Sequence, residues 1–206
     1  MTDVKELKTG TTTVGIICKD AVIIGTDKKA TMGYMVESKE AQKIHQLDSH
    51  IGITIAGSVA DAQAVVRILK AQFKLYRLER GAITLKGAAN LLSNILHGNR
   101  YYPFMNQFIL AGFDTVPHVY SFDPVGAFDE KDKFYSTGSG SPFVYGVLES
   151  AYKEGLSKEE GIALVVKCIK AAIQRDIASG GNGLLISFVD KDGYHELSDA
   201  EIKKYM

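Results

Sequence analysis

Thr11 follows Gly10 and opens a run of three threonines, and this junction offers the chain a route to nucleophilic chemistry. If the bond between Gly10 and Thr11 were cleaved, Thr11 would carry both a hydroxyl group and a free α-amine. An α-amine has a pKa of about 7.7 to 8.0 and can act as a general base at neutral pH. One residue would then supply nucleophile and base. The competing interpretation is a half-buried strand, because threonine is a favoured strand residue.

Two charged residues are candidate partners for this nucleophile. Asp27 follows the apolar run 21–26, and Lys43 lies inside the alternating segment 41–47. An inward-facing ammonium group needs a carboxylate partner, and Asp27 is the nearest candidate in sequence. We expect the pair to meet beside Thr11, where Lys43 would favour the deprotonated hydroxyl and Asp27 would fix the ammonium. Considered separately, Asp27 also fits a turn residue and Lys43 a solvated strand position.

Two glycine-containing turns are candidates for supporting roles. Gly57 lies between a strand-like and a helix-like segment, so its N–H could face a developing oxyanion near the positive end of the helix dipole. A glycine that only permits the turn fits the pattern equally well. The loop 138–141 lacks the lysine and the spacing of a phosphate-binding loop. Ser139 is therefore either a hydrogen-bonding helper or an ordinary loop residue.

Composition narrows the functional classes. Lys plus Arg and Asp plus Glu both number 24, so a zero formal net charge gives no electrostatic footprint for nucleic acid or an anionic membrane. Cys18 and Cys168 lie in apolar runs without zinc spacing, which predicts buried thiols and a reducing, cytoplasmic location. The histidines show no metal-binding spacing, and we expect neither a metal nor another cofactor. Residues 1–10 are polar and charged, and no apolar run reaches the roughly 18 residues of a membrane span.

Hydrophobic periodicity predicts the elements that must position these residues. The strands expected before the first helix are 12–18, 21–26, 41–47 and 51–56, with a loop or short hairpin at 28–38. A helix capped by Ser58 is expected to run to about Gly81. Its apolar positions are Val59, Ala62, Val66, Leu69, Phe73 and Tyr76. A second helix over 84–97 follows.

The same elements recur in the second half of the chain. The expected strands are 107–113, 118–122, 133–136, 184–190 and 193–197. Between them, one helix begins with Ser141 as N-cap and Pro142 in its first turn, and the next follows a capping box at 157–160. A short helix over 198–206 ends the chain. Strands and helix pairs are thus grouped rather than alternating, which predicts a single-domain α+β fold, a four-layer αββα sandwich of two antiparallel sheets flanked by helix pairs.

Six short motifs occur together along the chain. They are Thr-Thr-Thr-Val-Gly at 11–15, Gly-Thr-Asp at 25–27, Gln-Lys-Ile at 42–44, Thr-Ile-Ala-Gly at 54–57, Ser-Thr-Gly-Ser-Gly-Ser at 136–141, and Arg-Asp at 175–176 with Ser-Gly-Gly at 179–181. Jointly, they resemble the motifs of proteasome β subunits, most closely the archaeal type. The resemblance extends from Thr11 almost to the C-terminus. It implies an N-terminal nucleophile hydrolase fold and membership of the threonine protease family.

The resemblance also implies processing and site residues. A leader, residues 1–10, would be removed by self-cleavage at the Gly10–Thr11 bond, leaving 11–206 as a single catalytic domain. Thr11 matches the nucleophile, Asp27 and Lys43 match its charged partners, and Gly57 matches the oxyanion donor. The family residues around the threonine amine map onto Ser139, Asp176 and Ser179. The primary specificity pocket maps onto Ala30, Thr31, Ala41, Ile55 and Val59, which are small or apolar here and predict cleavage after hydrophobic residues.

Assembly and mechanism follow from the same resemblance. It implies a heptameric ring of β subunits inside a four-ring barrel, capped by α-subunit rings through which an ATP-dependent regulatory particle delivers unfolded polypeptides. Thr11 Oγ would attack a peptide carbonyl, with its own amine as base directly or through one water, to give an acyl-enzyme. Two alternatives remain open, a catalytically silent β subunit needed for ring assembly and another amidohydrolase of this fold acting on small amides. Silent subunits usually lack part of the Thr, Asp, Lys set, which is complete here.

Overall fold

Two five-stranded antiparallel sheets form the centre of the computed structural model, which describes residues 10–206. The first sheet contains, in spatial order, β10 (Phe134–Thr137), β1 (Thr13–Ile17), β2 (Ala21–Asp27), β11 (Leu184–Asp190) and β12 (Gly193–Glu196). The second contains β5 (Ile44–Asp48), β6 (Ile51–Gly57), β7 (Asn106–Phe113), β8 (Pro117–Phe122) and β9 (Phe128–Glu130). A separate hairpin consists of β3 (Ala30–Met32) and β4 (Met35–Ser38).

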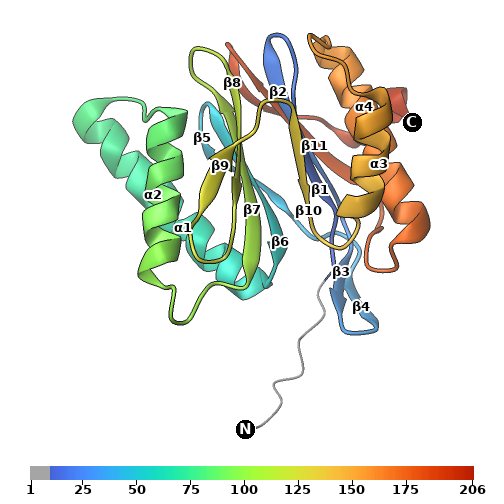
Figure 1. The fold of residues 1–206 in the computed structure, drawn as a ribbon, viewed down its shortest axis with the longest axis horizontal. Coiled ribbons are helices and arrows are strands. Elements are labelled where there is room, and N and C mark those ends of the chain that lie inside the picture. The colour runs from blue at the N-terminus through green and yellow to red at the C-terminus, as the bar shows by residue number, and fades with distance from the viewer. Residues whose placement is uncertain (1–9) are drawn as a thin grey trace, which may run out of the picture.

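Helices cover the outer faces of both sheets (Figure 1). On the second sheet lie α1 (Val59–Arg80) and α2 (Leu85–Gly98), and on the first lie α3 (Ser141–Ala151) and α4 (Lys158–Arg175). The chain ends with α5 (Asp199–Ile202) and a 3₁₀ turn (Lys203–Tyr205). This arrangement confirms the predicted four-layer αββα sandwich. Within residues 10–206 no helix combines the length and the apolar character needed to cross a membrane.

Three hydrophobic clusters hold the four layers together. One joins α1 and α2 to the second sheet, and includes Leu69, Phe73 and Leu92. Another joins α3 and α4 to the first sheet, and the third fills the space between the sheets with residues such as Ile24 and Ile109. Because strand side chains alternate between faces, each sheet supplies one set of residues to its helices and the other set to the opposite sheet.

Helix caps explain where most helices begin. Ser58 and Thr84 accept hydrogen bonds from the N–H groups of Asp61 and Gly87, and Ser157 forms the predicted capping box with Glu160. The prediction for α3 was wrong. Its N-cap is Gly140, Ser141 is its first helical residue, and no side chain caps it. The Gly140 N–H instead donates to the Thr11 carbonyl oxygen at 3.3 Å, so this loop is shaped by its contact with the Thr11 backbone.

Several boundaries also differ from the sequence prediction. Strand β9 was missed because it has only three residues, two of them acidic, at the edge of its sheet. Strand β5 begins at Ile44 rather than at 41, since the Ala41 N–H donates to the Lys28 carbonyl oxygen and draws the preceding segment away from the ladder. Val59, predicted to be on the apolar face of α1, is 50% exposed because it lies in the first turn beyond the end of β6.

Candidate active site

Thr11 lies two residues before the start of β1 and is only 5% exposed. Strands β1 and β2 are antiparallel and pair Thr13 with Thr26, so the residues just before β1 lie beside the end of β2. This register brings the Thr11 hydroxyl to Asp27, where Oγ1 donates to Oδ1 at 3.1 Å. Strand pairing alone therefore brings together two of the predicted site residues that are 16 positions apart.

The Asp27 carboxylate is completely buried and accepts five hydrogen bonds. Besides Thr11 Oγ1, Oδ1 accepts from the Thr12 N–H at 3.0 Å and from Lys43 Nζ at 2.8 Å. Oδ2 accepts from the N–H groups of Lys29 and Gly180, at 3.1 and 2.9 Å. A buried carboxylate is tolerated only when it is paired and hydrogen-bonded, and this one meets both conditions.

Lys43 is the cationic partner of Asp27. It immediately precedes β5, its backbone carbonyl accepts from the Ile55 N–H, and its side chain is 8% exposed. Burial lowers the pKa of the Lys43 ammonium from its ordinary value, while the charge and hydrogen bond of Asp27 oppose this shift. Lys43 Nζ and Thr11 Oγ1 donate to the same Asp27 oxygen, so a positive charge lies close to the candidate nucleophile.

A second group of hydroxyls surrounds the Thr11 nitrogen. The Thr11 N–H donates to Ser139 Oγ at 3.2 Å, and Ser139 Oγ donates to Asp176 Oδ2 at 2.7 Å. Ser179 Oγ donates to the same carboxylate oxygen at 2.6 Å and contacts Thr12 Oγ1 at 2.6 Å. The three residues that the resemblance mapped around the Thr11 amine are therefore linked to one another and to the Thr11 nitrogen.

Gly57 ends β6 at the point where its pairing with β5 stops. The last backbone bond toward the β5 side runs from the Ile55 N–H to the Lys43 carbonyl oxygen, at 3.0 Å. Alternate residues of a strand point their N–H groups to the same side, so the Gly57 N–H extends along this edge. Among residues 10–206 it has no hydrogen-bond acceptor. Its φ of +130° excludes other residues, and an added Cβ would lie 2.1 Å from the Met105 carbonyl oxygen.

An open pocket of about 400 Å³ lies against these groups. The residues that line it are Thr11, Ala56, Gly57, Met105, Asn106, Gln107, Pro124, Gly138 and Ser139. Thr11, which carries a hydroxyl group, and Gly57, whose N–H has no acceptor among residues 10–206, thus line the same space. This combination suits attack on a carbonyl group, because the N–H can stabilise the oxyanion that develops.

Comparison with known protein families agrees with this geometry. Residues 7–186 match the family model described as Proteasome subunit. The chain belongs to the proteasome subunit family. It is similar to proteasome subunit beta of Methanocaldococcus fervens, with 50% identity over 200 residues that cover 96% of this chain and 89% of the relative. It is also similar to proteasome subunit beta of Methanococcus maripaludis strain C5, with 45% identity over 205 residues, 98% of this chain and 93% of the relative.

Membership of the proteasome family confirms the predicted N-terminal nucleophile hydrolase fold and the resemblance to archaeal β subunits. Residues 1–9, which include nearly all of the predicted leader, lie outside the described residues. Gly10 is described, and its N–H donates to Thr31 Oγ1 at 3.2 Å.

The predicted specificity residues of this proteasome subunit are spread over three segments. Thr31 contacts Gly10, as described above, and Ala30 precedes it in β3. Ala41 lies between β4 and β5, and Ile55 is buried in the cluster beneath α1. Val59, the fifth, begins α1. None of the five lines the pocket beside Thr11, so their role as a specificity pocket stays a prediction.

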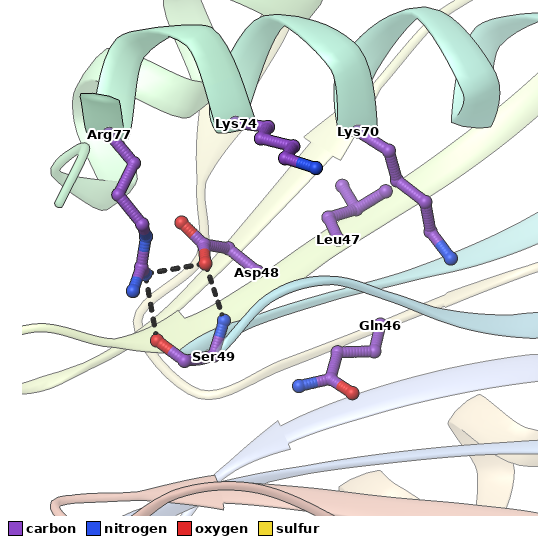
Figure 2. A pocket seen from close by; sticks show the side chains of 7 residues that line it. All are labelled: Gln46, Leu47, Asp48, Ser49, Lys70, Lys74 and Arg77. Atoms are coloured by element: carbon purple, nitrogen blue, oxygen red, sulfur yellow. Dashed lines mark hydrogen bonds and ion pairs between the residues drawn. The ribbon is translucent and has the colours of Figure 1, made fainter. Parts of the chain in front are cut away.

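A second hollow, of about 420 Å³, lies between α1 and the β5–β6 turn (Figure 2). Arg77 donates there to Asp48 and to the Ser49 hydroxyl, while Lys70 and Lys74 extend from the same helix. It shares no lining residue with the pocket beside Thr11. Its lining consists of paired and solvated charges and contains no buried hydroxyl beside a cation, in contrast to the pocket beside Thr11.

In the part of the chain that the structure describes, neither the cysteine thiols nor the metal-binding side-chain types offer an alternative reactive site. Cys18 and Cys168 are buried free thiols, and burial raises the pKa of each to about 12. Such thiols are almost entirely protonated at neutral pH and are weak nucleophiles. Across residues 10–206 no group of three or more His, Cys, Asp or Glu side chains could hold a metal ion.

Sequence reasoning missed several contributors to the site. The N–H donors of Lys29 and Gly180 act through the backbone, so no side-chain signal could identify them. Thr12 binds both Asp27 and Ser179, and its position next to the nucleophile was the only available hint. Asn106 lies one residue before the strand predicted from Gln107, although it is the first residue of β7. An amide side chain next to an apolar run is the signal that the sequence offers for it.

Proposed function

We propose that this chain is a catalytic β subunit of the proteasome core particle and acts as a threonine endopeptidase. The observation that carries the proposal is the Asp27 oxygen Oδ1, which accepts hydrogen bonds from both Thr11 Oγ1 and Lys43 Nζ. Thr11 is therefore a hydroxyl held beside a buried cation and at the edge of a pocket. A silent assembly subunit has no need for this arrangement.

Self-processing would be the first reaction. Thr11 Oγ attacks the Gly10 carbonyl carbon, the C–N bond to Thr11 breaks, and the acyl group passes from nitrogen to oxygen as an ester. Water then hydrolyses the ester, which releases residues 1–10 and leaves Thr11 with a free hydroxyl and a free amine. The hydrogen bond from the Gly10 N–H to Thr31 Oγ1 holds the scissile residue close to this site.

Peptide hydrolysis would use the same atoms. The freed Thr11 amine removes the hydroxyl proton, directly or through one water, as Oγ attacks a substrate carbonyl. The Gly57 N–H stabilises the oxyanion, and the proton passes to the departing amine. Water hydrolyses the resulting acyl-enzyme and regenerates the hydroxyl. Ser139 keeps the nitrogen of Thr11 oriented and Asp176 orients Ser139, as the hydrogen bonds from the Thr11 N–H to Ser139 Oγ and from Ser139 Oγ to Asp176 Oδ2 support.

The wider setting follows from the family. We propose that the chain assembles into a ring with other β subunits, that α-subunit rings cap this ring, and that a cytoplasmic ATP-dependent regulatory particle feeds unfolded polypeptides through them. The small or apolar character of Ala30, Ala41, Ile55 and Val59 supports cleavage after hydrophobic residues.

The test compares the intact masses of wild type, Thr11→Ala and Thr11→Ser after co-expression with a matching α subunit. The wild type should lose residues 1–10 and hydrolyse peptides. Thr11→Ala should retain them and lose about 10⁴-fold or more in peptide hydrolysis, since the nucleophile is gone. Thr11→Ser is the matched control, because it keeps a hydroxyl, and it should be processed. Retention of the leader by all three proteins in assembled rings would instead identify a silent structural subunit.

A further inference from the structure

Asn106 is a buried polar residue beside the candidate oxyanion donor. It begins β7, lies opposite Gly57 in the β6–β7 pairing and is 2% exposed. It also lines the pocket that contains Thr11. A carboxamide is seldom buried at a strand end unless both of its polar atoms have partners.

The Asn106 side chain holds the backbone directly after Gly57. Its Nδ2 donates to the Ser58 carbonyl oxygen at 3.0 Å. The Ser58 N–H donates in turn to the Met105 carbonyl oxygen at 2.9 Å. Both backbone polar groups of Ser58 are therefore bound to the start of β7, and its carbonyl oxygen also accepts the Ala62 N–H in the first turn of α1.

The other half of the amide has no partner in the described part of the chain. Asn106 Oδ1 is buried and accepts no hydrogen bond from residues 10–206. A buried carbonyl oxygen without a donor destabilises a fold, whereas an apolar side chain of similar size would not have this cost. Stability alone therefore does not account for an asparagine at this position.

Gly57 needs external support to keep its N–H in one direction. It has no side chain, its φ is +130°, and only β7 still pairs with it, because its pairing with β5 has already ended. An oxyanion donor accelerates a reaction only if it is preorganised, because reorienting it during the reaction consumes the stabilisation it provides. The Asn106 side chain restrains the backbone directly after Gly57, two peptide groups beyond the one that contains the Gly57 N–H.

We propose that Asn106 is a positioning residue that keeps the Gly57 N–H aimed into the pocket through its hydrogen bond to the Ser58 carbonyl oxygen. The role rests on the proposed peptidase function and adds to it a residue that does not itself touch the reacting atoms. Loss of the bond leaves the Ser58 carbonyl oxygen held only by the Ala62 N–H of α1, so the Gly57–Ser58 segment can shift relative to β7. The developing oxyanion is then stabilised less while substrate binding is little changed.

The first test is the steady-state kinetics of matured Asn106→Leu, with rates normalised to the processed fraction from intact mass. Removal of a whole oxyanion donor costs about 10²- to 10³-fold in kcat, and a misaligned donor should cost about 10-fold, with KM within about twofold. The melting temperature should not fall, because the unpartnered oxygen is removed as well. Asn90→Leu is the matched control, since Asn90 Nδ2 also bonds a backbone carbonyl, that of Lys86, but lies on α2. Its kcat should equal that of the wild type.

Asn106→Asp supplies a readout that a purely structural role would not move. Its ionised carboxylate cannot donate to the Ser58 carbonyl oxygen, but the protonated acid can, and burial favours the protonated form. The ratio of Asn106→Asp to wild-type kcat should therefore rise as the pH falls from about 8 to about 5.5, a window around the raised pKa of a buried carboxyl. The corresponding ratio for Asn106→Leu should stay flat.

The outcomes separate this role from the underlying function. Wild-type kcat in Asn106→Leu, a loss that parallels a fall in melting temperature, or a flat pH ratio for Asn106→Asp would each overturn the positioning role and leave the peptidase intact. An inactive, unprocessed wild type would overturn the peptidase and the positioning role together.

Discussion

Lys43 and Asp27 form a buried ion pair, with Nζ 2.8 Å from Oδ1. Their side chains are 8% and 0% exposed, so solvent screens the pair very little. The same Asp27 oxygen accepts the Thr11 hydroxyl. Loss of the ammonium would therefore leave an uncompensated carboxylate directly beside the nucleophile, in addition to removing a positive charge.

Lys43→Met should lower both stability and activity. Removing one partner of a buried pair costs about 3 to 5 kcal/mol in the free energy of unfolding, because the other charge stays buried and unpaired. Peptide hydrolysis should fall by about 100-fold or more, since no cation then favours the deprotonated Thr11 hydroxyl. Urea denaturation and a peptide-hydrolysis assay measure the two effects.

The double variant Asp27→Asn with Lys43→Met serves as control for Lys43→Met. It should recover part of the lost stability without activity, and equal stability of single and double variants would contradict the unpaired-charge explanation.

The pH dependence of kcat should be limited on the alkaline side by Lys43. Burial disfavours the charged ammonium and lowers its pKa from 10.5, so the proton is lost at a lower pH than from a free lysine. Activity should accordingly decline at a pH below 10.5, after rising at lower pH as the Thr11 amine, with a pKa of about 8, becomes a free base. Measurements of kcat from initial rates at a series of pH values up to and above 10.5 test the prediction. In Lys43→Arg the alkaline decline should move to higher pH, and an unchanged decline would assign it to another group.

The layered fold was predictable because its signals are local. Alternating strands, the caps Ser58 and Ser157 and the glycine-rich turns each appear in a few neighbouring residues. Asp27 and Lys43 were also accessible, since a charge in an apolar segment requires a partner. Gly57 was identified by its position between a strand and a helix.

The remaining features depend on contacts between distant segments. Ser141 has the sequence of an N-cap, yet the contact between Gly140 and the Thr11 backbone decides where α3 begins. The five donors around Asp27 include the Gly180 N–H, 153 residues away, whose direction is set only by the assembled loops. The partner of Asn106 lies 48 residues away, at the end of another strand. Propensity and spacing contain no information on such pairings.

The capping box of α4 should make stability depend on acid pH. The backbone N–H of Ser157 donates to Glu160 and lowers the pKa of this carboxyl below 4.5, with a further contribution from the Ser157 hydroxyl. The folded state thus favours the ionised form. The ionised Glu160 carboxylate therefore contributes to the free energy of unfolding. This contribution is fully present above the unfolded pKa of 4.5 and is lost as the pH falls through the lower pKa of the folded state.

Melting temperatures of wild type and Glu160→Ala test this dependence between about pH 7 and about pH 3, the range that spans carboxyl ionisation. The difference between the two proteins should be constant at the upper end and should shrink at the lower end. Glu159→Ala is the matched control, because this neighbouring glutamate lies in the same helical turn outside the capping box. A difference that persists at the lowest pH would show that the Glu160 carboxylate is not what stabilises the helix terminus.

The close packing of Gly10 should control removal of the leader. A Cβ added to Gly10 would lie 1.9 Å from Ala178 Cβ and 2.9 Å from Ser139 Oγ, so Gly10→Ala must displace the scissile carbonyl. A displacement of about 1 Å can slow a positioned reaction about 100-fold, and we expect processing to slow by this order in a time course of intact mass. Ala178→Gly in the same chain should restore part of the rate by removing the nearest obstructing atom. Once processed, Gly10→Ala yields the wild-type mature chain and must show its full peptidase activity. Processing of Gly10→Ala at the wild-type rate would mean that Gly10 moves away from Ala178 before the bond is cleaved.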